Sequence, residues 1–118
     1  MVKFEIKHKV TAKQGMNGLY SGKHWAVRKK EADYWHKLTY ISMKNQLPKL
    51  IAMRPVIITI NYDSRLDIDN HGYLSKMIID GMKGYLIEDD SRPYVIGLVQ
   101  LFHELGKDKI IIIVEEID

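Results

Sequence analysis

The stretch VIITINYDSRLDIDNHGYLSKMIIDGM, residues 56–82, decides the expected fold because it joins a strand directly to a helix. Residues 56–62 are mostly β-branched and follow a proline, which predicts a central strand. Asn70 is a favoured N-cap, so we expect a helix from Asn70 to residue 82 or 83. The apolar face of this helix is expected to hold Leu74, Met77, Ile78 and Met82. The acidic residues between the two elements therefore lie in a connection that both elements position.

The remaining periodic segments complete a small α+β domain. Alternation predicts a half-buried strand near residues 2–10, and helical spacing predicts a long helix over 24–46. One face of that helix is expected to hold Trp25, Ala32, Trp35, Leu38 and Ile41 or Ser42. Apolar runs predict strands over 95–102 and 109–116, with a β-hairpin between them. The Gly-rich segment 11–23 predicts a long loop. We expect a single domain over residues 1–118, with about four strands in a mixed sheet and two main helices on one face.

Composition narrows the chemistry and the location. The chain has no cysteine, which excludes disulfides, thiolate metal sites and a cysteine nucleophile. Its five histidines lack zinc-site spacing, and no P-loop or Ser-His-Asp pattern occurs. No apolar run approaches membrane-spanning length and no signal peptide is evident, so we expect a cytoplasmic protein without a membrane partner. The net charge is +3, with bases gathered in residues 1–54 and acids in 63–90 and 115–118. A basic flank beside an acidic pocket suits a nuclease, and a merely uneven surface is equally consistent.

Two acidic groups flank the predicted second helix. Asp67 and Asp69 would project to one side if they lay in extended chain, because a strand has a period of two. A helix that folds back would bring Asp89 or Asp90 beside them. Clustered carboxylate oxygens are ligands for hard divalent cations such as Mg²⁺. The alternative is that these acids are solvated turn residues. His71 lies close to them in sequence, and we expect it to be a solvated residue of the cap region more than a ligand or a base.

Lysines supply the second half of the expected site. Lys76 would lie on the polar face of the second helix, where it could stabilise charge on a phosphate. The alternative is an ordinary ion pair with Asp80, one helical turn away. On the first helix, Lys30, Lys37 and Lys44 recur every seven residues and predict a basic stripe. This stripe, extended by Arg28 and Lys29, would follow a nucleic-acid backbone or would simply be solvated.

The residues of both segments together resemble a known family. They are Arg65-Leu66-Asp67-Ile68-Asp69-Asn70, Lys76-Met77-Ile78-Ile79-Asp80-Gly81-Met82 and Ile87-Glu88-Asp89-Asp90-Ser91. This pattern resembles the RusA family of Holliday-junction resolvases, whose members carry Asp-x-Asp-Asn, a helix with Lys and Asp-(Ala/Gly)-Leu, and a terminal Asp-Asp. The segment 17–30, NGLYSGKHWAVRKK, is similar to the opening of phage-type members. The resemblance covers about residues 15–100.

The resemblance implies an Mg²⁺-dependent endodeoxyribonuclease, with Mn²⁺ as a possible substitute, that nicks four-way DNA junctions in pairs as a homodimer. It implies that Asp67, Asp69 and Asp90 are catalytic metal ligands, with Asp89 as a possible further ligand, and that Lys76 is the catalytic lysine. The DNA-binding residues are then expected to be Lys23, Arg28, Lys29, Lys30, Lys37 and Lys44. A role in DNA recombination and repair in a bacterial or phage-infected cell follows from the same likeness.

Three other readings remain open at this point. The chain could be a nuclease that acts on flaps or replication forks, because the sequence does not reveal which branched DNA the protein would recognise. It could be a junction-binding module without catalysis, which metal-dependent nicking would exclude. It could also be a small interaction protein with no nucleic-acid partner, which salt-dependent DNA binding would exclude.

Overall fold

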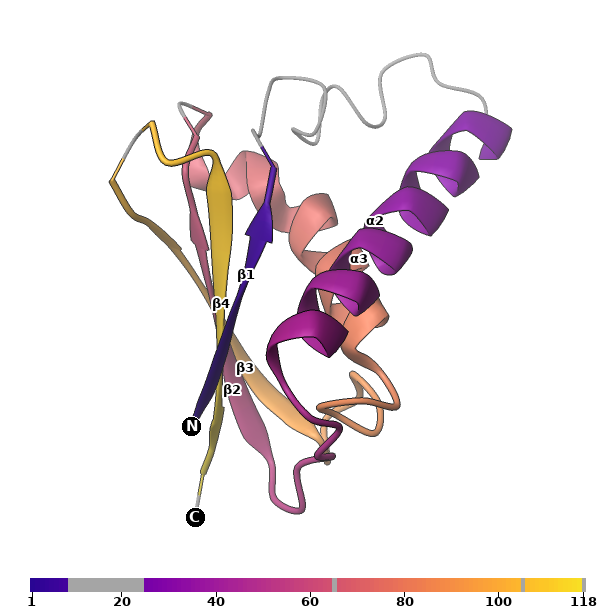
Figure 1. Ribbon diagram of the computed structural model, residues 1–118, viewed down its shortest axis with the longest axis vertical. Coiled ribbons are helices and arrows are strands. Elements are labelled where there is room, and N and C mark those ends of the chain that lie inside the picture. The colour runs from indigo at the N-terminus through magenta and orange to yellow at the C-terminus, as the bar shows by residue number, and fades with distance from the viewer. Residues whose placement is uncertain (9–24, 65, 105, 118) are drawn as a thin grey trace.

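A four-stranded mixed sheet forms one layer of the fold and two helices form the other, as Figure 1 shows. The computed structural model describes residues 1–8, 25–64, 66–104 and 106–117, without the side chains of Asp69 and Asn70. In chain order the elements are β1 (Val2–Lys7), α2 (Trp25–Gln46), β2 (Val56–Tyr62), the 3-10 helix η2 (Ile68–His71), α3 (Gly72–Met82), β3 (Val95–Phe102) and β4 (Lys109–Glu116). The α+β class with four strands and two main helices is confirmed. The expected loop over 11–23 lies outside the described residues.

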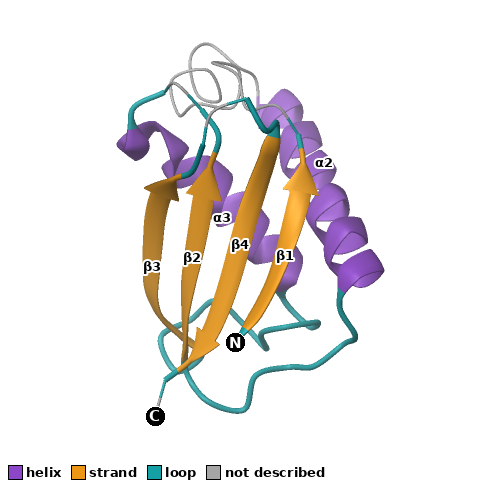
Figure 2. Cartoon of the chain, turned by 60° about the vertical axis from the view of Figure 1, so that its left-hand side comes forward, coloured by secondary structure: helices purple, strands orange, loops and turns teal. Residues whose placement is uncertain are grey.

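The strands follow the order β1-β4-β2-β3 across the sheet (Figure 2). β2 pairs in parallel with β3, whereas β4 pairs antiparallel with both β1 and β2. The expected hairpin between residues 95–102 and 109–116 is therefore wrong, because β2 lies between those two strands. The bounds of both strands are nevertheless as expected.

The connection between β3 and β4 is fastened to the end of β2. The backbone N–H of His103 donates to the carbonyl oxygen of Tyr62 at 3.0 Å. The carboxylate of Asp63, the residue after β2, accepts hydrogen bonds from the N–H groups of Gly106 and Asp108. Burial raises the pKa of Asp63, but these backbone donors outweigh it and leave that pKa below its ordinary value. This loop therefore crosses the end of β2 where a tight turn would have formed a hairpin.

The core lies between the sheet and the helices, which cover one face only (Figures 1 and 2). Alternate residues of β2 are fully buried, as the β-branched run predicts. The expected apolar face of α3 is confirmed, since its four predicted residues are at most 2% exposed. The strongly apolar face of β2 thus holds α3, and with it the acidic connection, against the sheet.

The buried face of α2 matches the expected one in part, since Trp35 is buried and Ala32 and Leu38 pack against the core. Trp35, Thr39 and Met43 form it, whereas Trp25 and Ile41 are 63% and 55% exposed. The exposure of Ile41 follows from the close crossing of α2 and α3 at Gly81. A Cβ atom at Gly81 would lie 2.9 Å from Cβ of Thr39, so glycine is needed there. Contact centred on Thr39 turns Ile41, two residues further along the helix, toward the opposite side.

Candidate functional site

An open groove between α3 and β3 brings two of the predicted site residues together. It encloses about 370 Å³ and is lined by Gly72, Lys76, Ile79, Asp90 and residues 95–98 of β3. Lys76 comes from the exposed side of α3, and Asp90 comes from the loop that leads into β3. The β2–α3–β3 connection creates this proximity, because the parallel pairing of β3 returns the chain along α3.

The two carboxylates before α3 are placed differently from the expectation. Asp67 is exposed and precedes η2, while Asp69 falls within that 3-10 turn. The assumption of extended chain through both residues is therefore wrong, because the turn replaces the two-residue alternation with a period of three. Asp67 does not line the groove, and the side chain of Asp69 lies outside the described atoms.

The start of α3 also differs from the expectation. The residue at its N-cap is His71 and makes no side-chain capping hydrogen bond, so the prediction of Asn70 as the cap is wrong. The preceding 3-10 turn leads straight into the helix, which moves the helix start beyond Asn70. His71 is not solvated, as had been expected, but fully buried, and its ring stacks on Tyr62 with centroids 4.2 Å apart. This stack fixes η2 to the end of β2.

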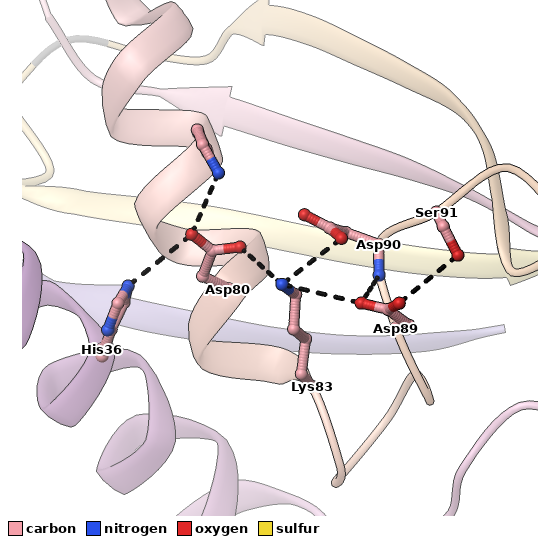
Figure 3. Close-up of polar contacts among 7 residues, drawn as sticks. His36, Asp80, Lys83, Asp89, Asp90 and Ser91 are labelled. Carbon is pink, nitrogen blue, oxygen red and sulfur yellow. Dashed lines mark hydrogen bonds and ion pairs between the residues drawn. The ribbon is translucent and has the colours of Figure 1, made fainter.

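An ion-pair network occupies the end of α3, as Figure 3 shows. The Nζ atom of Lys83 lies 3.1 Å from Asp80, 3.3 Å from Asp90 and 3.6 Å from Asp89. Asp80 in turn pairs with Lys76 at 3.3 Å, so the alternative ion pair considered for Lys76 is present. Nε2 of His36 on α2 lies 3.8 Å from Asp80. The sequence analysis missed Lys83 as a partner of Asp89 and Asp90. The available signal was that Lys83 follows Asp80 by about one helical turn.

The charges in this network stabilise one another. Partial burial raises the pKa of Asp80, but the hydrogen bond from Lys83 and the charge of Lys76 hold that pKa below its ordinary value. The hydrogen bond to Asp80 raises the pKa of Lys83. Both groups are therefore charged at neutral pH. Three carboxylates share two lysines in this network, which leaves an excess of negative charge beside the groove.

The donor chemistry of the site suits Mg²⁺, although no complete ligand set is present among the described side chains. No group of three acidic or histidine residues converges on a metal position within that part of the chain. Mg²⁺ commonly takes only one or two carboxylates from the protein and completes its shell with water and substrate phosphate. Asp90, which lines the groove and pairs with Lys83 at 3.3 Å, is the described residue best placed to hold such an ion. Asp89 is bonded to the backbone N–H of Asp90 at 2.8 Å, so it supports its neighbour.

The predicted DNA-binding residues that the structure describes all lie on α2. Lys30, Lys37 and Lys44 are exposed, and Nζ of Lys44 lies 5.9 Å from the ring centroid of Tyr40. Lys29 is exposed and pairs with Asp33 at 3.4 Å. Arg28 is half-buried. Lys23 lies outside the described residues. The basic stripe is thus a surface of α2, the helix that meets the ion-pair network through His36.

Comparisons with known proteins neither name nor exclude a family. A scan of protein-family models and a search of curated proteins both find no match to this chain. None of the helices that the structure describes has the length and apolar character needed to cross a membrane. The fold and site therefore define an α+β domain with a lysine- and carboxylate-lined groove.

Proposed function

We propose that this chain is an Mg²⁺-dependent endodeoxyribonuclease that resolves four-way DNA junctions by paired nicks and acts as a homodimer. The observation that carries the proposal is the shared groove of Lys76 and Asp90, two residues singled out beforehand by the resemblance to junction resolvases. The exposed basic stripe on α2 supports a nucleic-acid substrate.

Lys76 is the residue that would meet the scissile phosphate. Its side chain is 61% exposed, and its ion pair with Asp80 is a surface contact. Such pairs contribute little free energy, at most about 1 kcal/mol, so an entering phosphate can replace the Asp80 carboxylate. The ammonium group then donates to a phosphate oxygen as charge develops there.

Asp90, with Asp67 and Asp69 as the other candidate ligands, would hold the metal. A bound Mg²⁺ supplies Lewis-acid stabilisation of the phosphate and a more acidic water for attack. The protein's own part is to keep Asp90 in place. Lys83 does so by bonding to Asp90 and to Asp80 on α3, which ties the loop to the helix.

The test compares an end-labelled four-way junction with a linear duplex, a flap and a fork of matched sequence. Each is incubated with the protein in Mg²⁺ and in EDTA. We expect symmetric nicks confined to the junction and dependent on the metal. Asp90→Asn and Asp69→Asn should abolish nicking while junction binding survives, because each removes a carboxylate and leaves the basic stripe intact. Lys107→Ala is a control, since Lys107 is an exposed lysine remote in sequence from the site.

Other outcomes have definite meanings. Tight junction binding without any nick in Mg²⁺ or Mn²⁺ would make the catalytic assignment wrong and leave a junction-binding module. Faster cleavage of the flap or the fork would support the assignment as a nuclease but would show that another branched DNA is the preferred substrate. Charge reversal of Lys30, Lys37 and Lys44 should weaken binding and flatten its dependence on salt. An unaltered salt dependence would show that this stripe faces solvent only.

A further inference from the structure

The strand β3 forms one edge of the sheet and exposes large apolar side chains along its length. Its eight residues, VIGLVQLF, include no charged residue and no proline. Among the large apolar side chains that are at least 40% exposed, five belong to this strand. They are Ile96, Leu98, Val99, Leu101 and Phe102. Edge strands of this length are normally protected by charge, proline or a covering segment, because their free backbone groups pair with other chains.

The opposite edge of the same sheet carries such protection. β1 alternates lysine and glutamate with buried residues. The side-chain amide of Gln46, at the end of α2, accepts from the N–H of Glu5 at 2.8 Å and donates to its carbonyl oxygen at 2.7 Å. These bonds satisfy the outward backbone groups at the middle of β1. Within the described residues, no side chain bonds to the outer backbone groups of β3 in this way.

The exposed side chains of β3 lie on both faces of the sheet. Leu98 and Phe102 are in register with Ile58 and Tyr62 of β2, so they point toward the helix side. Val99 and Leu101 are in register with Thr59 and Asn61, so they point toward the open side. A partner stacked on either face would cover only one of these pairs. A strand added at the edge places side chains beside both.

We propose that the outer edge of β3 is the homodimer interface, where β3 of a second copy of this chain pairs with it antiparallel about a two-fold axis. An uncharged strand matches its own copy without like-charge repulsion, whereas DNA would require cations along this edge. A two-fold axis normal to the sheet makes the two strands antiparallel and keeps all four helices on one side. Both α3 helices, which line the two grooves, then lie on the same side of a continuous sheet.

In this dimer the second copy lies next to the groove, because residues 96–98 of β3 both line the groove and lie on the proposed edge. Its value for paired nicking rests on the proposed function. The interface itself follows from the strand, and its test contains neither DNA nor metal, so the two ideas can fail separately.

The experiment is sedimentation of the full chain over a dilution series. We expect the wild type to have twice the chain mass. Leu98→Lys and Leu101→Lys should each raise the dimer dissociation constant at least about 100-fold, because each buries an uncompensated charge at the interface. Leu50→Lys is the matched control, since Leu50 is 65% exposed and lies outside the sheet. It should leave the dissociation constant unchanged. Circular dichroism verifies that each variant is folded.

A second measurement uses single cysteines, because the chain has none of its own. Val99→Cys, in the middle of β3, should give a covalent dimer with a short bis-maleimide, and Leu50→Cys should not. A monomeric wild type, or equal cross-linking at both positions, would overturn the proposal. Loss of the dimer with Leu101→Lys but not with Leu98→Lys would also overturn it, because that result indicates stacking of the open sheet faces.

Discussion

The two edges of the sheet differ in how their backbone groups and side chains are used. At β1, α2 packs along the strand and Gln46 bonds to the middle of it, so this edge is closed by the chain itself. At β3, the side chains are apolar and exposed, and the groove with Lys76 and Asp90 runs beside the strand. If the proposed nuclease site and dimer are correct, the β1 side serves stability, whereas the β3 side serves contacts with other molecules. Changes on the first side should lower stability, and changes on the second should lower function.

Substitution of the two phenylalanines of the chain should give the largest difference in stability between the two edges. Phe4 on β1 is 1% exposed and Phe102 on β3 is 49% exposed. Phe4→Ala should lower the free energy of unfolding by about 3–5 kcal/mol, since it empties part of the core. Phe102→Ala should lower it by about 1 kcal/mol or less. Urea denaturation, with dilute protein to limit self-association, measures both. Equal losses would contradict the assigned roles of the two edges.

Lys76→Ala tests the functional side. We expect junction cleavage to fall about 100-fold, the effect of removing one group that stabilises developing charge. The free energy of unfolding should change by less than about 0.5 kcal/mol, because the side chain is exposed. Single-turnover cleavage and urea denaturation provide the two values. Unchanged cleavage, with Lys107→Ala as the reference, would remove Lys76 from the catalytic assignment.

Gln46→Ala opens the protected edge. It removes both hydrogen bonds to the backbone of Glu5, and we expect a loss of about 1 kcal/mol of stability. The outward groups of β1 become available to another chain, so self-association should increase. Light scattering and thermal denaturation measure the two effects. Asn45→Ala, the adjacent exposed residue, should produce neither, and an equal response from it would show that the amide of Gln46 does not protect β1.

Glu5→Gln gives the smallest expected effect and depends on pH. The hydrogen bond from Lys109, at 2.9 Å, lowers the pKa of Glu5 against the opposing effect of partial burial. A lowered pKa means that the contact stabilises the fold above the ordinary pKa of glutamate and is lost as the pH falls through the lowered value. The variant should therefore be less stable than the wild type by at most about 1 kcal/mol at neutral pH. The difference should vanish in acid, as thermal denaturation over a pH series would show. A difference that persists in acid would assign the effect to something other than the charge.

The sequence was sufficient to predict the strands and helices but not to predict which strands pair with each other. Residues 56–62, 95–102 and 109–116 formed the expected strands because apolar runs bounded by turn residues have few alternatives. The loop between β3 and β4 crosses the end of β2, where the carboxylate of Asp63 accepts hydrogen bonds from the N–H groups of Gly106 and Asp108. Nothing in the local pattern distinguishes that loop from a hairpin turn.

The candidate site was predictable only in part, because Asp67 does not line the groove. Lys76 and Asp90 were both expected at the site, and the β2–α3–β3 connection places them on one groove. Lys83 was missed as the centre of the ion-pair network, because its three carboxylate partners converge only after the chain has turned beyond α3. The burial of His71 was also missed, since it depends on a stack against the end of β2.

The most direct measurement uses a supercoiled plasmid that carries an extruded cruciform. If each copy in a β3-paired dimer nicks one strand, the wild type in Mg²⁺ should convert the plasmid to linear product by paired cuts at the cruciform. Leu101→Lys should yield mainly nicked circles. Absence of cleavage in both Mg²⁺ and Mn²⁺, or cuts spread over the duplex without regard to the cruciform, would contradict the assignment of this chain as a junction-resolving nuclease.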